Sequence, residues 1–350
     1  MSGAAERFRP TWAEVDTGAF SRNIDAIVGR LPERARLVAV LKANAYGHGA
    51  VELARLCDPG RVAMIAVALL EEALQLRRAG ITLPIIVFGP VGERGIVAAG
   101  DNDITLGVPG PEELAIACEV ARSRDVHVHL KLDSGMGRMG VTETELPAVV
   151  EKIRATPRLH VDGVYTHFAS ADDDPEFTQE QIERFDRMRA AIDAPLQHFA
   201  NSAATLRGLV RPGDLARVGI ALYDGVMRWR TEIARLKTLP PGHAIGYGTT
   251  FHTTRESRIA TLPVGYADGF NRLQSNNGTV LVRGRRAPIV GRVSMDLVTI
   301  DVTDIQGAAA GDEVVLLGDG ITADEIAARI DTISYEVFCS ISARVPRVYR

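Results

Sequence analysis

Between about residue 37 and residue 222, short apolar runs alternate with longer amphipathic stretches. Three of the amphipathic stretches repeat apolar residues at i, i+3, i+4 and i+7, which predicts helices over 70–79, 112–122 and 176–192. The apolar runs are short and have the composition of strands. Eight such runs occur, at 37–43, 63–69, 84–88, 104–108, 126–132, 159–165, 195–199 and 215–222.

This alternation is typical of βα units around a parallel sheet. Eight units predict a (β/α)8 barrel of the TIM type, and a doubly wound open sheet is the alternative. After about residue 230, Gly and Pro turns separate β-branched runs at 258–264, 279–283, 298–302 and 313–317, and one helix over 323–330 is capped by Thr322 with Glu325. We therefore expect a barrel over 13–229 and a mainly β domain built from 1–12 and 230–350.

The composition limits the classes of function. The 350 residues are 46% hydrophobic and 24% charged, as in an ordinary globular protein. A net charge of -4 gives no reason to expect nucleic acid or an anionic membrane as partner. No apolar run approaches the ~20 residues that a membrane-spanning helix needs. Residues 1–10 lack the apolar core of a signal peptide. The three cysteines, Cys57, Cys118 and Cys339, do not have the spacing of a disulfide framework or a zinc site. We expect a cytoplasmic protein that binds a small molecule, with no metal.

Functional groups of a barrel lie at the carboxyl ends of its strands and in the loops that follow. Lys42 ends an otherwise apolar strand, so its amine is expected at the barrel mouth. Such a lysine can simply reach solvent, but one that is desolvated among cations can condense with a carbonyl. The same rule selects further positions, three of them cationic: Asn44, Tyr46, Lys131, Arg138, His167, Asn201, Ser202, Arg217, Gly219 and Ile220.

The loops after the seventh and eighth strands match the phosphate site of such barrels. Residues 201–203 open a helix, and Gly219 and Ile220 offer backbone N–H groups. A carbonyl compound that carries a phosphate suggests pyridoxal phosphate. Arg138 follows two glycines in KLDSGMGRMG, which favours a donor to a carboxylate or phenolate over an ordinary tight turn. His167 either orients Arg217 or is a barrel-mouth histidine without a catalytic role.

Seven segments, in order along nearly the whole chain from Arg9 to Arg347, closely resemble alanine racemase. They are AVLKANAYGHG (39–49), KLDSGMGRMG (131–140), YTHFA (165–169), HFANSAA (198–204), RVGIALY (217–223), GYADG (265–269) and GRVSMD (291–296). The first and sixth segments together are highly specific for this family.

The resemblance implies an isomerase that interconverts L-alanine and D-alanine through a pyridoxal-phosphate aldimine on Lys42. Lys42 would be the base on the D-face and Tyr266 the base on the L-face, because racemisation needs one group to remove the α-proton and another to return it. In this family the tyrosine comes from the second subunit of a head-to-tail homodimer with shared active sites. The implied role is the supply of D-alanine for the peptidoglycan of bacterial cell walls.

Other roles are implied position by position. Arg138 would bind the phenolate oxygen and the substrate carboxylate, with the Met295 N–H completing the carboxylate site. Arg217 would donate to the pyridine nitrogen, and because a guanidinium keeps its proton, quinonoid intermediates and transamination would be disfavoured. Lys131 matches a position that is carbamylated in some members. The remaining cofactor contacts would be Tyr46, His167, Asn201, Ser202, Gly219 and Ile220, the phosphate taking Tyr46, Ser202, Gly219 and Ile220.

Two positions depart from the family pattern. Ala343 stands where the family usually has a tyrosine that walls the substrate pocket, so either the pocket admits serine or larger amino acids or a neighbouring side chain refills the space. The segment 223–231 is shorter than the family's linker, so the interdomain angle or the entrance would differ. The alternatives are a racemase of serine or of broader range, and a non-catalytic pyridoxal-phosphate carrier, which would lack Tyr266 and Met295.

Overall fold

The computed structural model describes residues 8–350, so the expectation about a signal peptide in residues 1–10 lies mostly outside the described range. The chain divides into two compact units. The first unit takes in the N-terminal residues as far as Ala19, the short segment Tyr46–His48, and Asp224–Arg350. The second unit comprises Phe20–Ala45 and Gly49–Tyr223.

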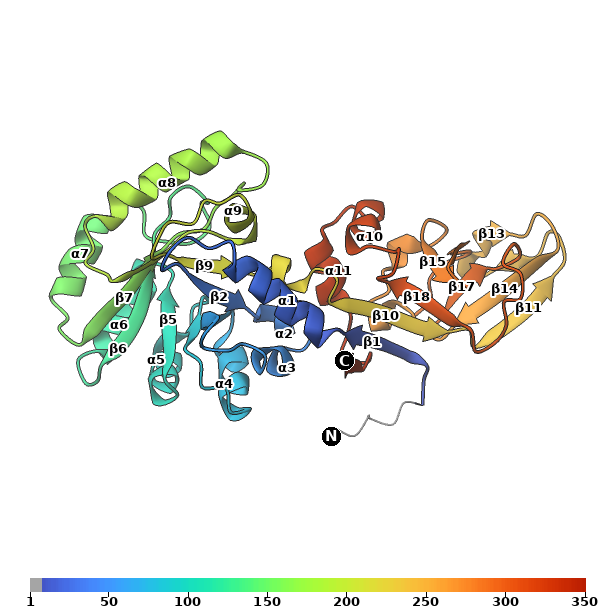
Figure 1. The fold of residues 1–350 in the computed structure, drawn as a ribbon, viewed down its shortest axis with the longest axis horizontal. Coiled ribbons are helices and arrows are strands. Elements are labelled where there is room, and N and C mark those ends of the chain that lie inside the picture. The colour runs from blue at the N-terminus through green and yellow to red at the C-terminus, as the bar shows by residue number, and fades with distance from the viewer. Residues whose placement is uncertain (1–7) are drawn as a thin grey trace. The chain divides into compact units, whose positions relative to one another are not determined.

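The second unit contains a parallel sheet of eight strands (Figure 1). In spatial order they run β8-β7-β6-β5-β4-β3-β2-β9. The Arg217 N–H donates to the Ala200 carbonyl at 3.0 Å, which brings the two edge strands together and nearly closes the sheet. The predicted barrel is confirmed and the open sheet is excluded. The strands are β2 Arg36–Val40, β3 Val62–Val67, β4 Ile85–Val87, β5 Ile104–Val108, β6 Val126–Lys131, β7 Leu159–Tyr165, β8 Leu196–His198 and β9 Leu215–Val218.

Helices between these strands cover the outer face of the barrel (Figure 1). The predicted helices are present as α4, α6 and α8. Helix α8 begins with Pro175 after Asp174, whose carboxylate accepts the Phe177 N–H, and both residues are typical of a helix start. The helices are α1 Thr17–Val28, α2 Lys42–Tyr46, α3 Ala50–Ala54, α4 Leu70–Arg78, α5 Gly92–Asp101, α6 Pro111–Val120, α7 Leu146–Arg154, α8 Pro175–Arg189 and α9 Ser202–Leu206.

The first unit is mainly antiparallel β structure. One sheet has the order β16-β15-β18-β10-β1-β19 and a second the order β11-β14-β17, while β12 and β13 form a separate pair. Strand β1 pairs antiparallel with β10 and parallel with β19. The strands are β1 Thr11–Val15, β10 Met227–Glu232, β11 Arg235–Leu239, β12 Ala244–Ile245, β13 Phe251–His252, β14 Ser257–Leu262, β15 Thr279–Val282, β16 Arg285–Pro288, β17 Val298–Asp301, β18 Glu313–Leu317 and β19 Arg347–Tyr349.

Two short helices complete this unit, α10 Ala323–Arg329 and α11 Ser334–Ser340. The Thr322 hydroxyl accepts the Glu325 N–H at 3.0 Å, so the predicted N-cap is confirmed. The Glu325 carboxylate pairs with Arg286 and Arg329. Within the described part of the chain, no helix combines the length and apolar character needed to cross a membrane.

Candidate active site

Positive charge gathers at the carboxyl end of the barrel strands. Lys131 on β6 and Arg217 on β9 are only 6% and 4% exposed. Burial, with the charges of Arg138 and Arg217, lowers the pKa of Lys131 to about 8. Burial and the charges of Arg217, Arg138, Lys131 and Lys42 lower the pKa of His167 to about 3. The four cations selected from the sequence therefore all lie close enough to His167 to lower its pKa, and His167 is neutral at physiological pH.

Arg217 is held by main-chain carbonyls and by two neutral histidines. Its Nη1 donates to the carbonyl and to Nδ1 of His198, at 2.7 and 2.9 Å. Its Nη2 donates to the Thr166 carbonyl at 2.6 Å and to Nδ1 of His167 at 3.3 Å. Burial lowers the pKa of Arg217 to about 10, which still leaves it cationic at neutral pH. The structure thus brings His167 and Arg217 together, which is the first of the two alternatives for His167.

A second histidine extends this arrangement into the barrel. Nε2 of His198 lies 2.8 Å from Nδ1 of His129. Because Arg217 donates to Nδ1 of His198, the proton of that ring is on Nε2 and is donated to His129. Burial, more than the nearby charges, lowers the pKa of His129 to about 4 and that of His198 well below its usual value, so both rings are neutral.

The sequence alone predicts no role for His129 or His198. The available signal was spacing, since His129 and Lys131 are two residues apart on one strand and therefore share a face. Gly163 on the neighbouring strand makes room for the ring, because a Cβ there would lie 2.7 Å from Nδ1 of His129. The ring of His198 stacks on Tyr165 with centroids 4.8 Å apart.

Lys42 follows β2 and opens a left-handed turn, α2. Ala43, Asn44, Ala45 and Tyr46 all have φ between 51 and 54°. This conformation costs a non-glycine residue about 1 kcal/mol or more, so the surroundings must stabilise the turn. Lys42 is exposed in the described structure. The desolvated lysine of the cluster is Lys131, because that residue lies within its strand and Lys42 lies beyond the end of its own.

Tyr46 belongs to the first unit together with Gly47 and His48. It is 6% exposed, and burial together with the neighbouring Tyr335 and Cys339 raises its pKa. Its ring lies 5.9 Å from that of Tyr335.

Three of the four groups assigned to a phosphate, Ser202, Gly219 and Ile220, lie near the start of α9. The Gly219 N–H donates to Oγ of Ser202 at 3.0 Å. The side-chain oxygen of Asn201 accepts the Ala204 N–H at 3.0 Å and caps α9, so residues 201–203 do open a helix. Ile220 begins the 3-10 turn Ile220–Tyr223 directly after Gly219.

Arg138 is exposed on the loop that follows β6. This loop is folded around Asp133, whose carboxylate accepts the N–H groups of Gly135, Met136 and Gly137 at 2.9 to 3.1 Å. Gly137 has φ of +67° and no atom within 4 Å of the position of a Cβ, so this glycine supplies conformational freedom and open space beside Arg138.

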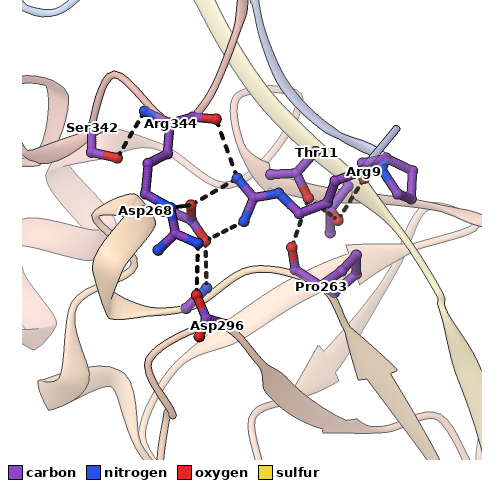
Figure 2. A network of polar contacts seen from close by, with 10 residues as sticks. Arg9, Thr11, Pro263, Asp268, Asp296, Ser342 and Arg344 are labelled. Atoms are coloured by element: carbon purple, nitrogen blue, oxygen red, sulfur yellow. Dashed lines mark hydrogen bonds and ion pairs between the residues drawn. The ribbon is translucent and has the colours of Figure 1, made fainter. Parts of the chain in front are cut away.

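Tyr266 lies in the first unit, on a loop organised by the buried carboxylate of Asp268. Figure 2 shows Asp268 with Arg9, Arg344 and Asp296 around it. Both oxygens of Asp268 accept from the Arg9 guanidinium at 2.8 Å, and Asp268 is 0% exposed. Arg344 lies 3.6 Å from Asp268 and also pairs with Asp296 at 2.7 Å. The Gly265 N–H donates to Asp268 at 3.0 Å, which closes the loop around Tyr266.

Met295 is joined to the same loop through the main chain. The Tyr266 N–H donates to the Ser294 carbonyl and the Ala267 N–H to the Met295 carbonyl, both at 3.0 Å. Gly265 permits this approach, because a Cβ there would lie 2.3 Å from the Met295 carbonyl oxygen. The side chains of Tyr266 and Met295 remain 42% and 53% exposed. Sequence reasoning assigned no role to Arg9 or Asp268.

Two protein-family models match the chain in succession. The alanine racemase N-terminal domain matches residues 15–226, and the alanine racemase C-terminal domain matches residues 226–349. An alanine racemase of Halothermothrix orenii is 42% identical, over 98% of this chain and 97% of that protein.

Solved structures agree with these matches. The alanine racemase of Clostridium difficile 630 is 36% identical with a TM-score of 0.92, covering 99% of this chain and 97% of the other. The alanine racemase of Bacillus anthracis with bound L-Ala-P is 38% identical with a TM-score of 0.92, covering 99% and 96%. The barrel, the β domain and these likenesses together mean that the chain is an isomerase belonging to the alanine racemase family.

Proposed function

We propose that the chain interconverts L-alanine and D-alanine with pyridoxal phosphate bound through Lys42. The observation that carries this proposal is the buried guanidinium of Arg217, which is held among neutral acceptors beside three further cations. A buried charge of this kind needs an anionic or strongly accepting partner. The ring nitrogen of the cofactor would be such an acceptor for Arg217, and the anionic phosphate and phenolate oxygens and the carboxylate of an amino acid would offset the remaining positive charge.

The donor set also fits the separate parts of this cofactor. Pyridoxal phosphate supplies an electron sink that acidifies the α-proton of a bound amino acid. Lys42 would hold its aldehyde carbon, Arg217 its ring nitrogen, and Arg138 its phenolate oxygen. The phosphate would be held by Tyr46, Ser202, Gly219 and Ile220, with His167 and Asn201 supporting these contacts.

Arg217 sets the electronic character of the site. A guanidinium keeps its proton, so a ring nitrogen that accepts from Arg217 stays unprotonated. Neutral His198 and His167 preserve this arrangement, because each accepts a hydrogen bond from Arg217 and neither supplies a proton to share. The site therefore favours return of the α-proton over side reactions such as transamination.

Two residues would exchange the α-proton. The Lys42 amine would remove or return it on the D-face, and the Tyr266 phenol would do so on the L-face. Arg138 and the Met295 N–H would hold the substrate carboxylate meanwhile. The hydrogen bonds that join the Tyr266 loop to Met295 keep the second base and this carboxylate donor in register.

We propose that Tyr266 and Met295 act in the site of a partner subunit, within a head-to-tail homodimer. Large apolar side chains are exposed on several loops of the first unit, including the loops that carry these two residues. Exposed apolar surface of this extent is typical of a face covered by another chain. The exposed set is Tyr247, Tyr266, Leu273, Met295 and Leu297.

Lys131 is proposed as a site of carbamylation. Its pKa of about 8 leaves a substantial fraction of neutral amine near physiological pH. The neutral amine attacks the carbon of carbon dioxide, forming an N–C bond and releasing one proton. The product is an anion, which suits a position surrounded by Arg138 and Arg217 better than a third cation does.

A second candidate function is the same reaction on serine or on a broader range of amino acids. This alternative is favoured by Ala343, which is exposed. The preceding residue, Ser342, is fixed to the Tyr266 loop because its N–H donates to the Asp268 carbonyl. A methyl group at this place fills less space than a tyrosine. The carrier alternative is disfavoured because both domains of a racemase are present. The proposal includes a cytoplasmic location and a role in supplying D-alanine for peptidoglycan.

The bases are tested with Lys42→Ala and Tyr266→Phe, assayed by circular dichroism for interconversion of the alanine enantiomers with added pyridoxal phosphate. Each variant is expected to lose about 10²-fold or more of the rate in both directions, because each lacks one proton-transfer group. When the two variants are mixed in equal amounts and exchange subunits, half of the dimers contain one subunit of each variant. Each of these mixed dimers has one site with both Lys42 and Tyr266, so the mixture is expected to regain about a quarter of the wild-type rate. Full activity of Tyr266→Phe would contradict the two-base mechanism, and no recovery on mixing would contradict shared sites.

Substitution of Arg217 tests the electronic argument. Arg217→Glu places an acid where the ring nitrogen is expected, so the racemisation rate should fall and the release of pyruvate from alanine should rise. The exposed Arg154→Glu is the matched control and should leave both rates unchanged. If the Arg217→Glu enzyme folds but releases no more pyruvate than the wild type, Arg217 does not suppress transamination and the electronic argument is wrong.

Carbamylation of Lys131 is tested by removing carbon dioxide. Below a pKa of about 8 the ammonium dominates and cannot react, so the carbamate should be lost more readily as the pH falls from 8 to 6. Wild-type activity should decrease in carbonate-free buffer and recover with bicarbonate, whereas Lys131→Ala should respond to neither. Equal insensitivity of both proteins would rule out a functional carbamate.

The substrate range is tested with Ala343→Tyr. If the small side chain admits larger substrates, the wild type should racemise L-serine at a rate comparable to L-alanine, and the tyrosine variant should lower the serine rate about tenfold relative to alanine. Negligible serine turnover by the wild type would leave alanine as the substrate.

A further inference from the structure

Glu72 links the residue after Lys42 to the next strand of the barrel. This glutamate is in the first turn of α4. Its Oε1 accepts the Ala43 N–H at 2.6 Å. Its Oε2 accepts the Ala68 N–H at 2.9 Å and the Leu69 N–H at 3.1 Å. One carboxylate therefore joins the end of β2 to the end of β3.

The left-handed turn after Lys42 is also fixed at its far end. The Ala45 N–H donates to the Leu41 carbonyl at 2.8 Å. The side-chain oxygen of Asn44 accepts the Ala50 N–H at 2.8 Å, and its carbonyl accepts the Gly49 N–H at 2.9 Å. Asparagine is among the non-glycine residues that adopt this conformation most readily. Ala43 has no side-chain group that could do the same, so it depends on Glu72.

We propose that Glu72 is a positioning residue for Lys42. The inference rests on the proposed function, in which the Lys42 amine holds the cofactor and moves a proton. The Ala43 N–H belongs to the peptide that follows the Lys42 Cα. Fixing that N–H in the left-handed turn fixes the direction in which the Lys42 side chain leaves the main chain, and therefore where its amine lies.

The charge of Glu72 matters as well as its length. Three N–H groups converge on its two oxygens, so both oxygens must be acceptors. The amide of Glu72→Gln has one oxygen, and its NH2 group would face at least one of these donors. The variant therefore leaves the turn unsupported on one side, and the Ala43 φ can return to the right-handed region that alanine prefers.

The experiment compares Glu72→Gln with Glu71→Gln, an exposed neighbour in the same turn of α4. Pyridoxal phosphate is titrated into each protein, the link to Lys42 is trapped with borohydride, and the modified peptide is quantified by mass spectrometry. Loss of a hydrogen bond to a charged acceptor predicts that Glu72→Gln needs about tenfold more cofactor for half-maximal labelling. Glu71→Gln should match the wild type.

The ratio of the deuterium isotope effects for D-alanine and L-alanine provides a second measurement, which a general loss of structure would not change. In the proposed reaction Lys42 removes the α-proton of D-alanine and Tyr266 that of L-alanine. Glu72→Gln should therefore raise the deuterium isotope effect for α-deuterated D-alanine relative to that for L-alanine. An unchanged ratio of the two isotope effects, together with unchanged labelling, overturns the inference.

The double variant Ala43→Gly with Glu72→Gln separates the turn from the start of α4. Glycine adopts positive φ without cost, so it should restore labelling of Lys42 to within about twofold of the wild type. If the double variant labels no better than Glu72→Gln, then Glu72 acts only as a cap of α4 and the inference is wrong. Should Glu72→Gln fail to fold, Glu72→Asp, whose shorter side chain cannot reach all three donors, takes its place.

These outcomes are distinct from a failure of the proposed function. If the wild type itself takes up no pyridoxal phosphate on Lys42, or does not racemise alanine, the proposed function falls and the inference falls with it. If the wild type is labelled and active while Glu72→Gln behaves like Glu71→Gln, only the role of Glu72 is refuted.

Discussion

The electrostatics at the carboxyl end of this barrel depend on Arg217, a buried guanidinium that contacts no carboxylate within residues 8–350. Arg217 is satisfied by carbonyl oxygens and by two imidazoles that stay neutral. Its uncompensated charge favours anions beside it and opposes protonation of the neighbouring imidazoles. Arg217 donates a hydrogen bond to His198, and His198 donates one to His129. Each ring therefore has a defined tautomer, and the ring nitrogen that accepts a hydrogen bond has no lone pair left for a second proton.

The rest of the barrel accommodates this polar chain. Two glycines on its strands leave space for rings, since a Cβ at Gly163 would meet His129 and a Cβ at Gly107 would lie 2.5 Å from the Tyr165 hydroxyl. Tyr165 in turn stacks on His198 and lies 5.6 Å beneath the Arg217 guanidinium. Polar and aromatic rings inside the barrel thus replace part of its usual apolar filling, and the two glycines provide the space that the rings occupy.

Much of this arrangement could be predicted because it is local in the sequence. Short apolar runs located all eight barrel strands, and the position of Lys42, Lys131 and Arg217 at strand ends predicted that their charges would lie together. The supporting residues could not be predicted in the same way. Glu72, His129 and Asp268 act through contacts with residues far along the chain or with backbone N–H groups, and an ordinary glutamate, histidine or aspartate carries no local signal of such a partner.

The pairing of β1 has a consequence for synthesis of the chain. Its residue Thr11 pairs with Thr231 and its residue Ala13 with Arg347, so both neighbours of this strand are translated long after it. At about 5–20 residues per second, the strand waits some tens of seconds with both edges unpaired, while the barrel strands are already available to one another. Arg9, just before this strand, binds Asp268, so the loop that carries Tyr266 is completed only when Arg9 meets a residue that is translated 259 positions later. The position of Tyr266, the proposed second base, therefore depends on a contact that forms late in synthesis.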